Sequence, residues 1–152
     1  MEDKIVLKRF NRKYIDDLID VFELSIKRTC SKDYTKEQII AWVSGADRDK
    51  WISIFESHYS LVAFLEERPV GFGDINEYGY LNMLYVHPKY QRKGIATVIC
   101  DRLEKHVQKD ILVDVSYTAK NFFLNRGYKV IKEQTVYRKG IAINNFKMSK
   151  SM

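Results

Sequence analysis

A strand pattern that passes through a short turn into a helix pattern constrains this chain more than any other feature. Residues 81–86 are mostly apolar, and Pro88 ends the run because proline has no N–H for a strand ladder. Beyond the turn, Ile95, Ile99 and Leu103 recur every four residues, which predicts one apolar helix face. The chain therefore has to place the N-terminus of a helix directly after a strand.

The turn between strand and helix has the composition of an anion site. Its six residues are Gln91, Arg92, Lys93, Gly94, Ile95 and Ala96. Gly94 can take a positive φ and lets another group approach the main chain closely. The first N–H groups of a helix have no internal acceptor, and the helix dipole places about half a positive charge there. With Arg92 and Lys93 beside it, the turn predicts a binding place for a diphosphate.

The order of residues in this turn resembles the acyl-coenzyme A motif of the GNAT acyltransferase superfamily, Q/R-x-x-G-x-G/A. Gln91, Gly94 and Ala96 occupy its three fixed positions, and the strand before it ends in V-x-P. Alanine in place of the second glycine is a small departure. A Walker loop does not fit because Lys93 precedes the glycine, and a dinucleotide-binding loop does not fit because Gly94 has no glycine partner. The resemblance implies acetyl-CoA as a co-substrate.

The rest of the chain predicts one α/β (α+β) domain over residues 1–152, with helices against a twisted mixed sheet. Strand patterns occur at residues 4–9, 60–66, 70–76, 81–87, 111–115, 128–131 and 141–148. Helix patterns occur at residues 15–26, 36–45, 95–107 and 118–125. Asn11 is expected to cap the first helix, and Thr35 with Gln38 forms a capping box before the second. The helix-length gap before Ile111 predicts a parallel pairing with the strand at 81–87.

Composition limits the class of protein but does not identify a binding partner. No stretch reaches the roughly 20 apolar residues required to span a bilayer, so we expect no membrane partner and a cytoplasmic location. Cys30 and Cys100 lack metal-ligand spacing, and we expect reduced thiols and no metal. The net charge of +6 permits nucleic-acid binding, but the basic residues are scattered, which favours solvated surface. The sequence is compatible with both a monomer and a homodimer.

An aromatic segment upstream resembles a small bacterial branch of the superfamily that has the signature D-Y-S/T-x-E-Q-I-x-A-W. The match runs from Asp33 to Trp42. In this branch the segment is expected to cover the acceptor site, although core packing is the more frequent role of tryptophan. The resemblance therefore implies that Tyr34 and Trp42 bind the acceptor substrate, with Tyr80 converging on them.

The resemblance also implies roles for the strand before the turn. In the family a bulge opens this strand, so that main-chain groups of residues such as Leu84, Tyr85 and Val86 contact the acyl carbonyl and the pantetheine. Strand alternation predicts one shared face for four residues, Tyr80, Asn82, Leu84 and Val86. Family bases commonly occupy the positions of Tyr80 or Asn82. A tyrosine of ordinary pKa, about 10, is a poor base at neutral pH, and an asparagine could orient water but not take a proton.

A third segment resembles the family motif N-x-x-A-x-x-[LF]-Y-x-x-x-G-F. Ser116 stands where the family has an asparagine that approaches the pantetheine, and serine keeps hydrogen-bonding capacity with less reach. Phe123 stands where a tyrosine often protonates the leaving thiolate. We expect both residues at the cofactor, and Tyr128 becomes a candidate for the missing acid.

These features predict an N-acetyltransferase that moves the acetyl group of acetyl-CoA to a primary amine of a small molecule, peptide or protein. Two alternatives stay open. The first is acetylation of aminoacyl-tRNA, which the positive charge permits. The second is a non-catalytic acyl-CoA-binding module, because Phe123 cannot donate a proton and the strand before the turn offers no carboxylate or histidine as a base.

Overall fold

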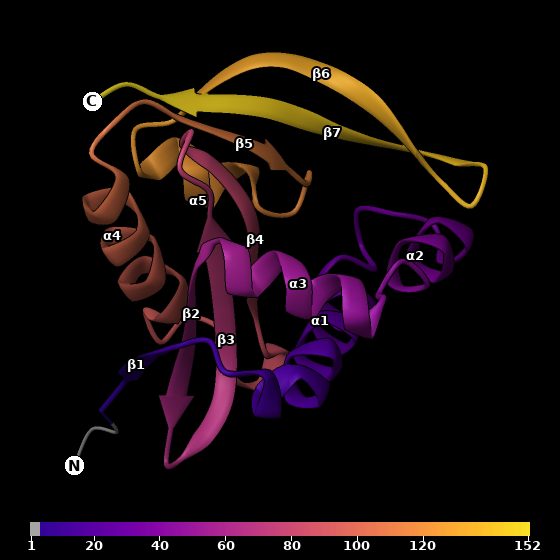
Figure 1. Cartoon of the computed structure of the whole chain (residues 1–152). Coiled ribbons are helices and arrows are strands. Elements are labelled where there is room, and N and C mark those ends of the chain that lie inside the picture. Colours follow the sequence, from indigo (N-terminus) through magenta and orange to yellow (C-terminus); the bar gives the residue numbers. More distant parts are fainter. Residues whose placement is uncertain (1–3) are drawn as a thin grey trace.

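A mixed sheet of seven strands in the order β1-β2-β3-β4-β5-β7-β6 forms the centre of the computed structural model, which describes residues 4–152 (Figure 1). The strands are β1 (Val6–Arg9), β2 (Tyr59–Leu65), β3 (Arg68–Ile75), β4 (Tyr80–Val86), β5 (Ile111–Val115), β6 (Lys129–Arg138) and β7 (Ile141–Lys150). Neighbouring strands are antiparallel except β4 and β5, which run parallel. The predicted fold class and the predicted parallel pair are confirmed.

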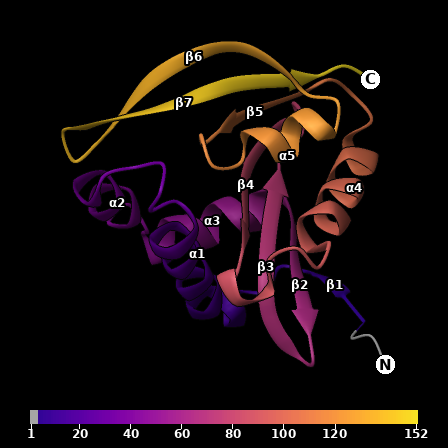
Figure 2. The same cartoon turned by 180° about the vertical axis from the view of Figure 1, so that it is seen from behind.

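Helices cover both faces of this sheet (Figures 1 and 2). One face carries α1 (Ile15–Thr29), α2 (Lys36–Val43) and α3 (Arg48–Ser57), and the other carries α4 (Ile95–Val107) and α5 (Lys120–Asn125). Two short 3₁₀ turns, η1 (Arg12–Tyr14) and η2 (Pro88–Tyr90), precede α1 and α4. The helix α4 is the crossover that joins the two parallel strands.

The ends of the N-terminal helices follow local hydrogen-bonding rules. Thr35 and Gln38 form the predicted capping box at the start of α2. Asn11 caps η1 instead of α1, which begins later at Ile15. The sequence prediction omitted α3, although Asp47 accepts a hydrogen bond from the third residue of that helix, as an N-cap does.

The sheet separates two apolar clusters. Ile99, Leu103 and Phe123 belong to the cluster between the sheet and α4–α5. Phe22 and Trp51 belong to the cluster between the sheet and α1–α3. Full burial of one such side chain stabilises a fold by about 1.5–3 kcal/mol. Apolar packing therefore covers both faces of the sheet, and each side chain of β4 must point to one face or the other.

A β-bulge interrupts β4 at its centre. Asp74 of β3 lies opposite Met83, whereas the next residue, Ile75, lies opposite Leu81. Asn82 is thus the extra residue of β4, and the alternation of side chains shifts by one position beyond it.

This shift makes the predicted shared face of β4 wrong. Leu84 and Val86 pack in the cluster on the α4–α5 side. Tyr80 precedes the bulge and faces away from that cluster, and Asn82 hydrogen-bonds to Asp74 on the α1–α3 side. The four residues that simple alternation would align are therefore divided between the two faces of the sheet.

The parallel strands β4 and β5 stay together for only a short distance. Their register includes two pairs, Tyr80 with Leu112 and Leu81 with Val113. From Asn82 to Val86, β4 remains paired with β3 but has no strand partner on its other edge within residues 4–152. The sheet therefore opens between β4 and β5, next to the start of α4.

Candidate active site

A cavity of about 650 Å³ lies at the opening between β4 and β5. All of β4 lines it, and residues 113–116 line it from the side of β5. Its walls also include Gln91 and Ala96 on the α4 side and Tyr34 and Trp42 on the α1–α3 side. The cavity thus connects the two faces of the sheet.

The turn into α4 keeps the helix N-terminus open. Gly94 is the N-cap residue with φ +81°, and no side chain caps the helix. A Cβ added to Gly94 would meet no atom within 4 Å. The first N–H groups of α4 have no acceptors inside the helix, so they can bind an anion from outside. Ile95 anchors this turn in the core, where it is 2% exposed.

The side chains of the turn divide into two groups. Gln91 Nε2 donates to the carbonyl oxygen of Val86 at 2.9 Å, which ties the turn to the end of β4. Arg92 and Lys93 are exposed and lie outside the residues that line the cavity. An open helix N-terminus with two cations beside it fits the diphosphate of coenzyme A.

Leu84, Tyr85 and Val86 all line the cavity along the open edge of β4. Because this edge has no strand partner, its main-chain groups are available to a ligand. Ser116 and Phe123 line the same cavity from the segment after β5. The Ser116 hydroxyl accepts a hydrogen bond from the Ala119 N–H at 3.1 Å, so the serine also shapes its own turn.

Tyr34 and Trp42 lie on the other side of the opening. The Tyr34 hydroxyl donates to the carbonyl oxygen of Asn144 at 2.8 Å and accepts from the N–H of Tyr117 at 2.9 Å. Burial raises the pKa of Tyr34 to about 12. Trp42 packs edge-on against the ring of Tyr34, with 5.4 Å between the ring centroids. The hydroxyl of Tyr34 therefore joins distant segments, and its ring is the part that a substrate can contact.

Tyr80 lines the cavity from β4, together with Tyr34 and Trp42. Its hydroxyl donates to Asp114 Oδ2 at 2.9 Å. Burial, and then the neighbouring Asp114 carboxylate, raises the pKa of Tyr80, so an even smaller fraction of it than of a free tyrosine is ionised and able to take a proton at neutral pH. Arg138 and Lys50 also line this side, so a charged acceptor would meet cations as well as the carboxylate of Asp114.

Two polar residues that the sequence analysis did not select, Asp74 and His58, support this region. Asp74 of β3 is fully buried and contacts His58 and Asn82. The available signal was a carboxylate in the otherwise apolar strand VGFGDI, because buried carboxylates need partners.

The structure does not bring Tyr128 to the cavity. Tyr128 is 2% exposed and is absent from the cavity wall. Its hydroxyl donates to Glu104 Oε2 at 2.8 Å, and burial followed by this hydrogen bond raises the pKa of Tyr128. Burial alone would raise the pKa of Glu104, but its contacts with Arg126, Lys150 and Tyr128 lower it. This polar cluster joins α4, the end of α5 and β7 outside the cavity wall.

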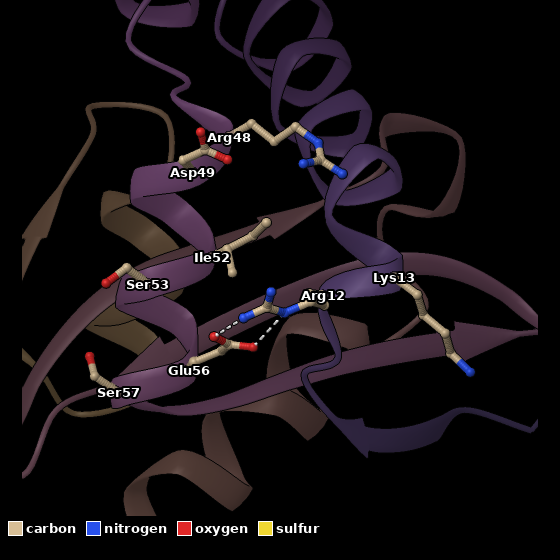
Figure 3. A pocket seen from close by; sticks show the side chains of 8 residues that line it. All are labelled: Arg12, Lys13, Arg48, Asp49, Ile52, Ser53, Glu56 and Ser57. Atoms are coloured by element: carbon tan, nitrogen blue, oxygen red, sulfur yellow. Dashed lines mark hydrogen bonds and ion pairs between the residues drawn. The ribbon is translucent and has the colours of Figure 1, made fainter.

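A second hollow lies on the outer surface between η1 and α3 (Figure 3). Its two arginines are already paired, Arg12 with Glu56 at 2.8 Å and Arg48 with Asp16 at 3.0 Å. Within the described residues 4–152, no group of three potential metal ligands occurs, and no helix is long and apolar enough to cross a membrane. The opening between β4 and β5 is therefore the better candidate for chemistry.

Comparisons with known proteins agree with this geometry. A family model described as "Acetyltransferase (GNAT) domain" matches residues 30–150. The chain is 32% identical over 146 residues to the uncharacterised N-acetyltransferase YafP of Escherichia coli (strain K12), a match that covers 96% of this chain and 95% of that protein.

Solved structures show the same similarity. A GCN5-related N-acetyltransferase from Rhodopseudomonas palustris superposes with a TM-score of 0.95 at 32% identity, covering 100% of this chain and 99% of the other. The PaiA N-acetyltransferase of Thermoplasma acidophilum, solved with coenzyme A, superposes with a TM-score of 0.82 at 20% identity, covering 98% and 99%.

Proposed function

Because this chain belongs to the GNAT acetyltransferase family and is an N-acetyltransferase, we propose that it transfers the acetyl group of acetyl-CoA to a primary amine of a small molecule, peptide or protein. The observation that carries this proposal is the cavity that joins the open N-terminus of α4 to an aromatic pocket through the gap between β4 and β5. A relative of the same fold was solved with coenzyme A, which supports the choice of co-substrate.

Acetyl-CoA would lie on the side of the cavity that includes the start of α4. The N–H groups around Gly94, together with Arg92 and Lys93, would hold its diphosphate. Main-chain groups on the open edge of β4, from Leu84 to Val86, would contact the pantetheine and the acyl carbonyl. Hydrogen bonds from such fixed N–H groups stabilise the negative charge that develops on a carbonyl oxygen under attack.

The acceptor would approach from the side of α1 and α2, past Tyr34, Trp42 and Tyr80. Its neutral amine nitrogen forms a bond to the acetyl carbon, and the carbon–sulfur bond breaks. The nitrogen loses one proton and the departing thiolate gains one, so the products are an acetylated amine and free coenzyme A. Neither Tyr80 nor Asn82 is a strong base, which makes water the carrier of the proton that leaves the amine.

No ionisable side chain is needed for the thiolate to leave. Phe123 lines the cavity but cannot donate a proton, and the hydroxyl of Tyr128 is bonded to Glu104 elsewhere. A thiol has an ordinary pKa of about 8.5, so a thiolate is a tolerable leaving group that water can protonate. We place the reaction in the cytoplasm. The small bacterial branch and the homodimer stay predictions.

An acceptor screen tests the proposal. The purified protein is mixed with acetyl-CoA and a panel of primary amines, peptides with free N-termini, or aminoacylated tRNA, and thiol release is measured together with the mass of the acceptor. We expect thiol release that depends on a small amine or a peptide, with one acetyl group gained by the acceptor. Binding of acetyl-CoA without turnover on any acceptor would contradict an enzymatic role for this site, and turnover on tRNA alone would replace the acceptor class.

A further inference from the structure

A buried carboxylate on β3 organises the centre of β4. The side chain of Asp74 is 0% exposed. Its Oδ2 lies 2.8 Å from His58 Nδ1 and 3.0 Å from Asn82 Nδ2, and its Oδ1 lies 3.0 Å from the N–H of Met83. All three partners approach with a nitrogen. This arrangement satisfies a carboxylate that would otherwise be costly to bury.

The contact between Asp74 and Asn82 fixes the direction of an amide. Both oxygens of Asp74 accept hydrogen bonds from nitrogen donors, and Asn82 turns its Nδ2, not its Oδ1, toward Asp74. The two amide atoms of asparagine point in different directions, and Asn82 lines the cavity. Within residues 4–152, no group donates a hydrogen bond to Asn82 Oδ1. The Oδ1 atom of Asn82 can therefore accept a hydrogen bond from a ligand in the cavity.

The same carboxylate holds the bulge that places Asn82. In a regular antiparallel ladder, a main-chain carbonyl would take the N–H of Met83, but here Asp74 Oδ1 takes it. Asn82 is then the residue without a partner on β3, at the point where β5 also leaves β4. One side chain thus sets both the position and the orientation of Asn82.

We propose that Asp74 is a positioning residue for acetyl transfer, and that the Asn82 Oδ1 that it orients accepts a hydrogen bond from the amine of the acceptor. The inference rests on the proposed function, because it assigns the group that meets the acceptor. An amine nitrogen carries N–H donors that need an acceptor while its lone pair faces the acetyl carbon. Asn82 Oδ1 supplies that acceptor without taking the proton.

The contact with Asp74 makes a specific prediction for a nearly isosteric change. In Asp74→Asn, the new Oδ1 can still accept from the N–H of Met83. The new Nδ2 then faces Asn82, whose amide must rotate to offer its oxygen in return. The cavity would receive the NH₂ group of Asn82 in place of its oxygen. The packing volume is preserved, while the hydrogen-bonding group that the amine meets is reversed.

Kinetics with one identified amine test this mechanism. We expect Asn82→Ala and Asp74→Asn each to lower kcat/KM for the amine roughly 10- to 100-fold, the loss typical of one hydrogen bond to a charged or reacting group. Acetyl-CoA affinity should change less than about twofold, because the diphosphate site lies elsewhere. The double variant should lose no more than Asn82→Ala alone, since Asp74 acts through Asn82.

Ser60→Ala provides a matched control. Ser60 lies opposite Asp74 in the β2–β3 register, is 4% exposed, and donates to the carbonyl oxygen of Phe55 at 2.8 Å. Its loss removes a buried hydrogen bond on the same face without touching Asn82, so kcat/KM should stay unchanged while stability falls. Losses that multiply in the Asp74→Asn, Asn82→Ala double variant would overturn the positioning role. If Asp74→Asn does not fold, an unchanged kcat/KM for Asn82→Ala still overturns the hydrogen bond to the amine.

A measurement without turnover separates this inference from the proposed function. Nuclear magnetic resonance of the wild-type protein follows the Nδ2 protons of Asn82, with the exposed Asn121 on α5 as a reference. Exchange of an Asn82 Nδ2 proton with water should be slower than exchange of the Asn121 Nδ2 protons, because the hydrogen bond to Asp74 protects it. Equal exchange rates would refute the positioning by Asp74. Failure of every amine as an acceptor, with slow exchange retained, would refute the proposed function and the hydrogen bond to the amine, whereas the positioning of Asn82 by Asp74 would stand.

Discussion

The two sides of the cavity are built from different kinds of chain segment. The side proposed to bind acetyl-CoA, the cofactor side, comes mainly from one continuous stretch, in which β4 ends at Val86 and α4 begins at Ile95. The side proposed to bind the amine, the acceptor side, is built from separate segments that bring Tyr34, Trp42 and Tyr80 together. The first side offers main-chain groups at a strand edge and a helix end, whereas the second offers side chains. The positions of the main-chain groups depend on local conformation, whereas the positions of these side chains depend on packing between distant segments of the chain.

The two sides should therefore respond differently to mutation. A change on the cofactor side should weaken acetyl-CoA binding without disturbing side-chain packing, because a Cβ added to Gly94 would meet no atom within 4 Å. A change on the acceptor side should alter both stability and acceptor binding, because the Tyr34 hydroxyl also forms hydrogen bonds with Asn144 and Tyr117. Four predictions test this difference, from the largest expected effect to the smallest.

The largest effect is expected for Gly94→Trp. An indole at this position would fill the approach to the N-terminus of α4 and lower acetyl-CoA affinity about 100-fold, or roughly 2.7 kcal/mol. Titration calorimetry measures it. Gly140→Trp is the matched control, since Gly140 also has a positive φ, +77°, and a Cβ there also meets no atom within 4 Å. Equal affinity losses for both variants would mean that backbone strain, and not a phosphate site, causes the effect.

The second prediction concerns Tyr34→Phe on the acceptor side. Loss of the hydroxyl leaves Asn144 and Tyr117 without buried hydrogen-bond partners, which should lower the free energy of unfolding by about 2 kcal/mol at pH 7. Acetyl-CoA affinity should change less than about twofold if the two sides are independent. Urea denaturation and calorimetry measure the two quantities. A larger loss of affinity than of stability would break the proposed division.

The pH dependence of this stability difference follows from the raised pKa of Tyr34, about 12. An unfolded tyrosine has a pKa of about 10. A group whose pKa is higher in the folded protein contributes fully below the unfolded value and loses its contribution as pH rises through the folded value. The advantage of the wild type over Tyr34→Phe should therefore be constant up to about pH 10 and shrink toward pH 12. A constant difference across this range would contradict the buried position of the hydroxyl.

The third prediction concerns Arg92→Gln, which removes an exposed charge beside the helix N-terminus. Acetyl-CoA affinity should fall about threefold at low ionic strength and less at high salt, because exposed charges are screened. Lys139→Gln is the control, since Lys139 is also exposed and also has a positive φ, but lies in the β6–β7 turn. Equal salt dependence for both variants would show that net charge alone attracts the ligand.

The smallest effect on turnover is expected for Tyr128→Phe. Because the Tyr128 hydroxyl bonds to Glu104 outside the cavity wall, we expect no change in kcat or in its pH profile. Stability should fall by about 1 kcal/mol through the lost hydrogen bond. Phe123→Tyr makes the opposite comparison, because its hydroxyl would enter the cavity and should raise kcat about twofold as a proton donor. A lower kcat for Tyr128→Phe would reinstate Tyr128 as the acid.

Sequence patterns predicted much of the fold because the local signals agreed with one another. Alternation and apolar runs located all seven strands, and the capping box located the start of α2. The helix α3 was not predicted, although Trp51 and Phe55 lie one helical turn apart in the core. Most other boundaries moved by a few residues. The strand β6 was predicted too short, because it continues from residue 131 to Arg138 through mostly exposed residues that its pairing with β7 holds in a strand.

The residues of the candidate site fall into the same two groups, those fixed by local sequence and those fixed by contacts between distant segments. Gln91, Gly94 and Ala96 could be selected from their spacing, because a turn into a helix is a local structure. The carboxylate of Asp74 stands out in an apolar strand, but its role could not be predicted, since its partners come from the end of α3 and from the next strand. A period of two also could not reveal the bulge at Asn82, which requires the register between β3 and β4.

The sequence by itself determined that a strand leads through Gly94 into a helix, and hence that a helix N-terminus without a side-chain cap follows the strand, because periodicity and a positive φ are local properties. Only the tertiary structure decided which side chains face the ligand. The hydrogen bond from Met83 to Asp74 accompanies a one-residue shift of β4, and the packing of Tyr128 against Glu104 keeps its hydroxyl out of the cavity. Both outcomes depend on contacts between segments far apart in the chain, where burial makes each polar group find a partner.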